Sequence, residues 1–84
     1  MIEVHLYGKL RRFTNNEDST RDSIAYIPVE EGDAIKDTIR RIGIPIEEVG
    51  STIFLNGEYS PLERKVKGGD RLGIFPHNMA MIIV

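Results

Sequence analysis

Apolar and polar side chains alternate at the start of the chain. Over residues 2–7 every second side chain is aliphatic, a period of two that predicts a half-buried strand, and Gly8 ends it. Residues 14–23 are polar and rich in turn formers, so we expect an exposed hairpin loop there. Residues 24–29 are predicted to form a second strand. Pro28 near its end indicates an edge position or a strand end, because proline cannot donate to a ladder.

The period changes to that of a helix after residue 33. Ile35, Ile39 and Ile42 are spaced i, i+4 and i+7, which forms one apolar stripe. Asp33 is predicted as the N-cap, since its carboxylate can accept hydrogen bonds from the free amides of the first turn. Gly43 is the expected left-handed residue after the last turn. The segment therefore predicts an amphipathic helix of about ten residues that must bury one face.

The second half of the chain contains the clearest hairpin signal. Residues 53–55 are apolar on both faces, which indicates a central strand. Asn56-Gly57 then supplies a tight turn to a short return strand that begins at residues 58–59. Residues 71–76 are predicted to form the last strand.

The order of these elements is strand, strand, helix, strand, short strand, strand. One helix must bury its apolar stripe, and one sheet offers a face to receive it, so the order predicts a two-layer α+β sandwich. We expect a single domain over residues 1–76, followed by an apolar tail at residues 77–84.

The composition excludes several kinds of chemistry. The 84 residues include no cysteine, which removes disulfides, thiolate metal sites and cysteine nucleophiles. The formal net charge of −2 gives no general attraction to nucleic acid or to an anionic membrane. The first residues lack the features of a signal peptide, and no stretch approaches the roughly 20 apolar residues of a membrane span. We therefore expect a soluble, cytoplasmic protein.

Candidate catalytic and metal-binding residues are scarce. His5 and His77 are the only histidines, and a metal site usually needs three or four ligands. We expect His5 to be a partly exposed strand residue and His77 a solvated residue of the tail. There is no nucleophile–base–acid set and no glycine-rich phosphate loop before a helix. The sequence thus predicts a protein that is not an enzyme and that has no catalytic residue, metal or cofactor.

Basic residues form three clusters along the chain. The first interpretation is solvated surface, and the alternative is electrostatic docking onto an acidic face of a partner enzyme, which would speed association. Nucleic acid is a weaker option, because neighbouring carboxylates cancel the field and aromatic residues are not interleaved. The clusters are Lys9, Arg11 and Arg12; Arg40 and Arg41; and Arg64, Lys65 and Lys67.

Four segments, taken in order, carry a resemblance to a known family. They are LYGKLRRF after the first strand, GDAIKDTIRRIGIP at the helix, TIFLNGEY at the hairpin and VKGGDRLGIFP at the last strand. With these segments the chain resembles the ubiquitin-like β-grasp proteins of the MoaD/ThiS sulfur-carrier family over residues 1–76. The resemblance implies a mixed sheet of four to five strands with one main helix packed on one face.

The resemblance also implies a function located at the last residue. Such a carrier typically ends in Gly-Gly, an activating enzyme adenylates the terminal carboxylate, and sulfur replaces the adenylate. The resulting thiocarboxylate delivers sulfur to a pterin or thiazole precursor. This sequence departs from the pattern there, because the Gly-Gly pair falls on Ala80 and Met81 when the segments are aligned from Phe75-Pro76. Val84 is β-branched and would crowd the carboxylate.

Three interpretations of the tail remain open. It could pack as structure, within the monomer or across a dimer, since isoleucine and valine favour strands. It could be a docking peptide whose methionines adapt to the groove of a partner. It could also support sulfur transfer, from Val84 or after trimming.

We therefore predict a MoaD/ThiS-like protein with a degenerate C-terminus that acts as a non-enzymatic protein-binding or carrier-like subunit in sulfur or cofactor metabolism, of molybdopterin or thiamine type. The alternatives are a functional sulfur carrier with a processed or unusual C-terminus, and a self-associating structural domain. The expected partner is an activating enzyme or a cofactor-synthase subunit, or a second copy of the chain bound through the tail. The predicted partner-binding residues are Phe75, Pro76, His77, Met79, Met81, Ile82, Ile83 and Val84.

A second surface is suggested by aromatic residues on the predicted strands. Phe54, Tyr59 and Phe75 are candidates for an exposed apolar patch of the kind that ubiquitin-like folds use for binding. Packing in the core is the alternative for the two phenylalanines.

Overall fold

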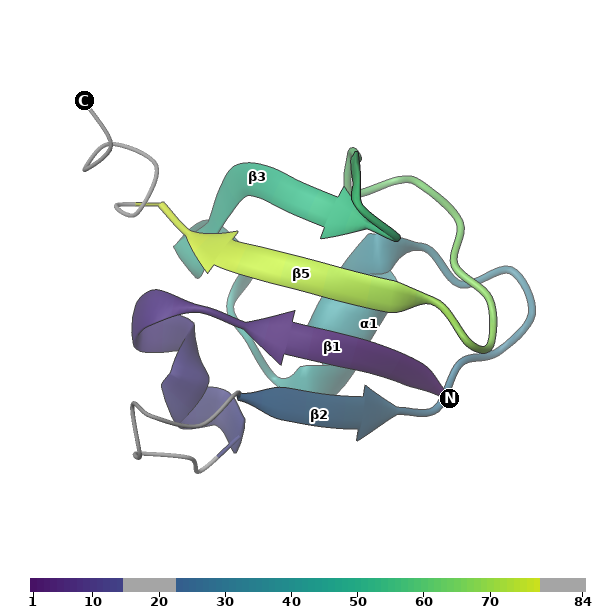
Figure 1. Cartoon of the computed structure of the whole chain (residues 1–84), viewed down its shortest axis with the longest axis horizontal. Helices are drawn as coiled ribbons and strands as arrows, with labels where there is room; N and C mark the ends of the chain where they lie inside the picture. Colours follow the sequence, from purple (N-terminus) through teal and green to yellow (C-terminus); the bar gives the residue numbers. More distant parts are fainter. Residues whose placement is uncertain (15–22, 78–84) are drawn as a thin grey trace.

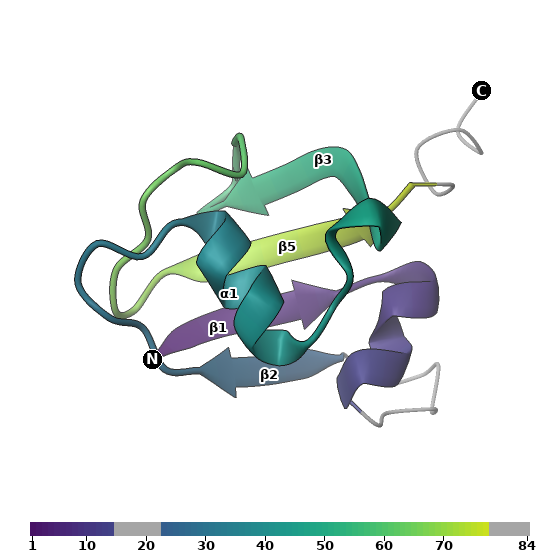
Figure 2. The ribbon, with the colours of Figure 1, turned by 180° about the vertical axis from the view of Figure 1, so that it is seen from behind.

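In the computed structural model, which describes residues 1–14 and 23–77, five strands form one mixed sheet and one α-helix lies across a face of it (Figure 1, Figure 2). The sheet order is β2-β1-β5-β3-β4, with β1 and β5 parallel and the other neighbours antiparallel. The predicted α+β architecture is therefore confirmed. In chain order the elements are β1 (Ile2–Leu6), η1 (Gly8–Thr14), β2 (Ile24–Ile27), α1 (Ile35–Ile42), η2 (Ile46–Glu48), β3 (Val49–Leu55), β4 (Glu58–Tyr59) and β5 (Arg71–Pro76).

The core lies between the sheet and α1. Alternate residues of β1, β3 and β5 point toward the helix, and the stripe of α1 points back at them. Burying one such aliphatic side chain stabilises the fold by about 1.5–3 kcal/mol. The buried aliphatic residues of these four elements are Ile2, Val4, Leu6, Ile35, Ile39, Val49, Ile53, Leu55, Leu72 and Ile74.

The helix begins one residue later than predicted, so the expected N-cap role of Asp33 is wrong. Ala34 occupies the N-cap, and the carboxylate of Asp37 accepts its amide at 2.8 Å. Asp33 instead accepts the amide of Glu30 at 2.8 Å and a hydrogen bond from Nη1 of Arg41 at 2.6 Å. The Asp33 carboxylate therefore ties the loop before α1 to its last turn. The helix ends as predicted, with a left-handed residue at position 43.

The segment after β1 forms a 3₁₀ helix, η1, that the sequence pattern did not indicate. Leu10 is completely buried, and Phe13 packs against the core from the same segment. The predicted loop of residues 14–23 lies, at positions 15–22, outside the described residues. At its two ends, the hydroxyl oxygens of Thr14 and Ser23 are 2.6 Å apart. The strands on either side, β1 and β2, pair antiparallel as a hairpin requires.

The strand predicted to be central, β3, lies one place away from the middle of the sheet. The middle strand is β5, which pairs with β1 on one side and β3 on the other. Near the start of β3, Gly50 lies under the end of β5, where an added Cβ would be only 2.9 Å from the carbonyl oxygen of Pro76. This close approach of two backbones places the end of β5 beside the start of β3.

Candidate functional site

The face of the sheet that α1 does not cover is turned toward the viewer in Figure 1. Its residues follow from strand alternation and register, since Glu3, Tyr26 and Arg71 are aligned across three strands, as are His5, Gly73 and Phe54. We call this surface the open face. It consists of Glu3, His5, Tyr7, Tyr26, Phe54, Tyr59, Arg71, Gly73 and Phe75.

Four aromatic rings form a continuous row across the open face. Tyr7 stacks on Phe75 with ring centroids 4.3 Å apart and planes 7° from parallel. Phe75 meets Phe54 edge to face at 6.3 Å, and Phe54 meets Tyr59 in the same way at 6.0 Å. Each such pair adds about 0.5–1.5 kcal/mol beyond its buried area. Tyr59 is nonetheless 64% exposed, so the row is ordered by its own contacts and still presents apolar surface.

A charged cluster borders this aromatic row. Nε2 of His5 lies 2.5 Å from Oε2 of Glu3, and Nε of Arg71 lies 3.3 Å from the same oxygen. The hydrogen bond with His5, together with the positive charge of Arg71, holds the pKa of the Glu3 carboxyl below its usual value. The Arg71 side chain remains 71% exposed. It therefore has donors left for a carboxylate of a partner.

Gly73 opens a hollow at the centre of the open face. The hollow measures about 300 Å³ and is lined by His5, Tyr7, Phe54, Gly57, Arg71, Gly73 and Phe75. Among residues 1–14 and 23–77, no close contact requires glycine at this position. Its backbone is extended, and an added Cβ would meet, within the described residues, Cε2 of Tyr7 at 3.6 Å and a carbonyl oxygen of Phe54 at 4.0 Å, which are ordinary contacts.

A glycine inside a strand costs about 0.5–1 kcal/mol relative to alanine. Neither strain nor crowding calls for glycine at position 73, and its missing side chain leaves the hollow open. In strands, such a glycine often marks a place where another molecule approaches closely. The site is thus an aromatic-walled hollow with an arginine at one end, suited to an apolar side chain that lies next to an acidic group.

The predicted partner-binding residues do not all lie in one kind of environment. Phe75 belongs to the aromatic row and is half-buried. Pro76 is buried opposite Val49, and His77 is exposed directly after β5. The remaining predicted residues, Met79, Met81, Ile82, Ile83 and Val84, lie outside the described residues. Their role as a binding segment stays a prediction.

Sequence reasoning found part of this site. Phe54, Tyr59 and Phe75 were candidates for an exposed patch, and the structure brings them into one row. Tyr7 and Gly73 were missed. The sequence does contain a signal for Gly73, because apolar residues at 72 and 74 share one face of the last predicted strand, which leaves 71, 73 and 75 on the other face.

The three basic clusters are largely engaged within the protein. Arg12 pairs with Glu48, Arg41 with Asp33, and Arg64 with Glu58. Lys65 donates to the carbonyl oxygen of Gly32. These contacts favour a structural role for those members over a docking role. Exposed ion pairs of this kind contribute about 0–1 kcal/mol each.

The fold and the aromatic open face define the chain as a ubiquitin-like β-grasp protein. Its sequence matches the Mut7-C ubiquitin family model over residues 1–82, so the chain belongs to that family. The resemblance to MoaD/ThiS-like ubiquitin-fold proteins, inferred from the four segments, is confirmed at this level. No curated protein matches the sequence significantly.

The fold is shared with solved structures, among them two small proteins. The H. volcanii small archaeal modifier protein 1 superposes with a TM-score of 0.68 at 17% identity, covering 89% of this chain and 94% of that one. A Pyrococcus furiosus protein named as a candidate molybdopterin converting factor, subunit 1, superposes with a TM-score of 0.65 at 24% identity and the same two coverages. At these identities the similarity establishes the fold.

No described helix is long and apolar enough to cross a membrane. Within residues 1–14 and 23–77, no group of three or more His, Asp or Glu side chains is arranged to hold a metal ion.

Proposed function

We propose that this protein is a non-enzymatic, carrier-like binding module whose open face docks onto a partner protein. The partner class we propose is an activating enzyme or a cofactor-synthase subunit of sulfur or cofactor metabolism, of molybdopterin or thiamine type, acting in the cytoplasm. The end of β5 and the tail after it would extend the same contact. Phe75, His77 and residues 79–84 belong to this proposal.

The observation that carries the proposal is the hollow over Gly73. A side chain from a partner can enter it, stack against Tyr7 and Phe54, and place a carboxylate near Arg71. Aromatic residues and arginine are the types that dominate binding energy in protein interfaces. The tyrosine-rich surface around the hollow would then form a rim that excludes water from the contact.

The carrier-like role is proposed from similarity of fold. One solved structure of this fold is named a modifier protein and the other a molybdopterin converting factor subunit. The residues at the Gly-Gly positions of such carriers are Ala80 and Met81 here. We therefore place binding, rather than a thiocarboxylate, at the centre of the proposed function.

The experiment fills the hollow at a position where an added Cβ makes only ordinary contacts with the described residues. The wild-type protein is used to isolate partners from the native lysate, and the partners that it captures are identified and purified. Calorimetric titration then measures the affinity of each partner for wild type and for Gly73→Val. We expect the variant to bind at least about tenfold more weakly, which corresponds to about 1.4 kcal/mol.

A matched control is available in the turn before β5. Gly68→Ala adds a methyl group at an exposed glycine that does not have a positive φ. The described atoms nearest to the new Cβ lie at 3.9 and 4.0 Å, which are ordinary contacts, so this change should leave binding unchanged. Equal affinity of the partner for wild type and Gly73→Val would refute the open face as the docking surface. A Gly73-dependent partner outside sulfur and cofactor metabolism would contradict the proposed pathway and leave the docking surface standing.

A further inference from the structure

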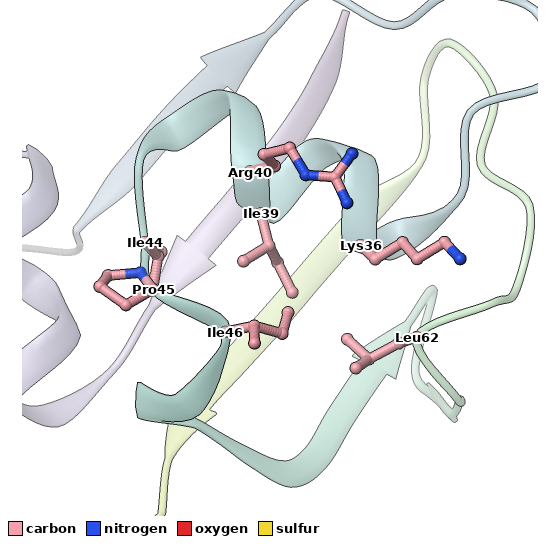
Figure 3. Close-up of a pocket in the computed structure, with 7 residues that line it drawn as sticks. All are labelled: Lys36, Ile39, Arg40, Ile44, Pro45, Ile46 and Leu62. Atoms are coloured by element: carbon pink, nitrogen blue, oxygen red, sulfur yellow. The ribbon is translucent and has the colours of Figure 1, made fainter.

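A second concave surface lies on the other side of the sheet, next to α1 (Figure 3). It is a groove of about 360 Å³ between α1, η2 and the segment after β4. We call it the helix-side groove. It is lined by Lys36, Ile39, Arg40, Ile44, Pro45, Ile46 and Leu62.

The walls of this groove are held in place by backbone hydrogen bonds. The backbone amide of Lys36, in the first turn of α1, donates to the carbonyl oxygen of Leu62 at 3.0 Å. This bond holds the segment after β4 against the helix. On the other side, the amide of Ile44 donates to the carbonyl oxygen of Ile39 at 3.2 Å. The groove is therefore preformed, and a ligand would not have to bear the entropic cost of ordering it.

The lining is apolar at the base and basic along one side. Ile39 and Ile44 are buried, whereas Ile46 remains 48% exposed. Figure 3 shows Lys36 and Arg40 extending from α1 along one side, with Ile46 and Leu62 opposite. The lining residues include no carboxylate.

The two cations are available to a ligand. Arg40 has one ion-pair partner among the described residues, Asp37 at 3.4 Å, and its side chain is 76% exposed. The ammonium of Lys36 makes no hydrogen bond or ion pair within residues 1–14 and 23–77. The neighbouring Arg41 differs, because it is bound to Asp33 at 2.6 Å and to the carbonyl oxygen of Pro28 at 3.0 Å. Of the three basic residues of α1, Lys36 and Arg40 therefore lack a strong partner among the described residues, and these are the two that line the groove.

We propose that the helix-side groove binds a short acidic and aliphatic segment of a second partner protein. An aliphatic side chain of that segment would cover Ile46 and fill the space above Ile39, and carboxylates beside it would pair with Lys36 and Arg40. Complementary charge selects an acidic partner and speeds its association. The groove lacks aromatic residues for stacking on a base, which favours a peptide over a nucleic acid.

The helix-side groove is separate from the docking surface of the proposed function, because α1 and the open face lie on opposite sides of the sheet (Figure 1, Figure 2). Both surfaces can therefore be occupied at once. The protein would then connect two partners.

The test uses the full chain and two labelled peptides. The first has the sequence Asp-Glu-Leu-Ile-Asp-Glu, and the second has lysine at every acidic position. Fluorescence anisotropy measures affinity, and amide resonances in ¹H–¹⁵N spectra locate the contact. We expect the acidic peptide to bind at least about tenfold more tightly than the basic one, with shifts at Ile39, Ile44, Ile46 and Leu62.

Four variants separate the effect of charge from that of apolar contact and locate the binding. Lys36→Glu and Ile46→Ser should each weaken binding of the acidic peptide by about fivefold or more. Lys9→Glu makes the same charge change on η1, away from the groove, and should have little effect. Gly73→Val should leave binding of the acidic peptide intact. A negative result for the helix-side groove can therefore be told apart from a negative result for the open face.

Several results would overturn the proposal. Equal binding of the two peptides, or shifts located at Tyr7 and Phe54 instead of the groove, would do so. Binding of the acidic peptide only after deletion of residues 79–84 would identify the chain's own tail as the occupant. A concentration-dependent increase in mass that Ile46→Ser abolishes would identify a second copy instead.

Discussion

The ring of Tyr7 stacks on the ring of Phe75, although 67 residues of the chain lie between them. The contact exists because β1 and β5 are parallel neighbours and the ladder continues past β1, where the amide of Tyr7 donates to the carbonyl oxygen of Ile74 at 3.2 Å. The stack joins the first strand to the last at the end of the sheet from which the tail departs. It thereby fixes one wall of the hollow over Gly73.

A double-mutant cycle measures this stack. We expect Tyr7→Ala and Phe75→Ala to be coupled by about 0.5–1.5 kcal/mol in the free energy of unfolding, the value of an aromatic pair beyond its buried area. Urea denaturation of the four forms gives the coupling. Tyr26, on the edge strand of the same face, serves as control, and its coupling to Phe75 should stay below about 0.5 kcal/mol. Additive effects of the first pair would contradict a stabilising stack.

Two glycines of the sheet should respond oppositely to alanine. Gly73→Ala should raise the free energy of unfolding by about 0.5–1 kcal/mol, because the site has room for a methyl group and strand glycine is costly. Gly50→Ala should lower it by about 1–3 kcal/mol, because the new Cβ would be 2.9 Å from the carbonyl oxygen of Pro76 and the backbone must move. Chemical denaturation decides the signs. A destabilising Gly73→Ala would mean that the glycine is needed by the fold.

Thr38 offers a stabilising substitution. Its side chain is completely buried in α1, and its hydroxyl has no hydrogen-bond partner in the described part of the chain. Replacement by valine keeps the shape and removes an unsatisfied polar group, so Thr38→Val should add about 1 kcal/mol to the free energy of unfolding. Thr52→Val, at a half-buried position, is the matched control and should change stability by less than about 0.5 kcal/mol. Loss of stability in Thr38→Val would indicate a hidden partner for the hydroxyl.

The protein should lose stability in acid through two buried aspartates. The hydrogen bond from Arg41 holds the pKa of Asp33 below its ordinary value of 3.8. Burial opposes ionisation of Asp70, but hydrogen bonds from Asn56 and Lys67 outweigh it and the pKa is also lowered. A lowered pKa in the folded state means that the stabilisation is complete well above pH 3.8 and is lost as the pH falls through the folded-state pKa.

Urea midpoints measured from about pH 5 down to about pH 2 test this dependence. Asp33→Asn and Asp70→Asn should each be less stable near neutral pH, since each breaks charge-assisted hydrogen bonds, and should show a flatter decline in acid. Glu63→Gln removes an exposed carboxylate as a control and should keep the wild-type slope. An unchanged slope in both aspartate variants would remove these two groups as the origin of acid sensitivity.

The apolar tail should contribute to stability or assembly. Deleting residues 79–84 removes five large apolar side chains, each of which is worth about 1.5–3 kcal/mol if fully buried. We expect either a melting temperature lower by at least about 4 °C or dissociation of an oligomer. Calorimetry and light scattering measure the two. If truncation alters neither melting temperature nor mass, the tail does not pack on the domain or on a second copy.

Much of the fold and part of the site could be predicted from the sequence. The alternation in residues 2–7, the isoleucine stripe of α1, the turn at Asn56-Gly57 and the helix end at Gly43 are local signals, and each predicted an element that the structure contains. The helix start was predicted one residue early. Asp33 has the right chemistry for an N-cap, but it is held by Arg41 from the far end of the helix, a contact that local pattern does not contain.

The sequence by itself determined which side chains of β1 and α1 face inward, because a period of two or of 3.6 depends only on local backbone geometry. It also determined the absence of cysteine chemistry and the modest net charge. Only the tertiary structure decided which outward-facing residues meet. The parallel pairing of β1 with β5 brings Tyr7 to Phe75, and the pairing of β5 with β3 sets Gly73 between His5 and Phe54. These contacts depend on strand order, which is set by packing of the whole core rather than by any one segment.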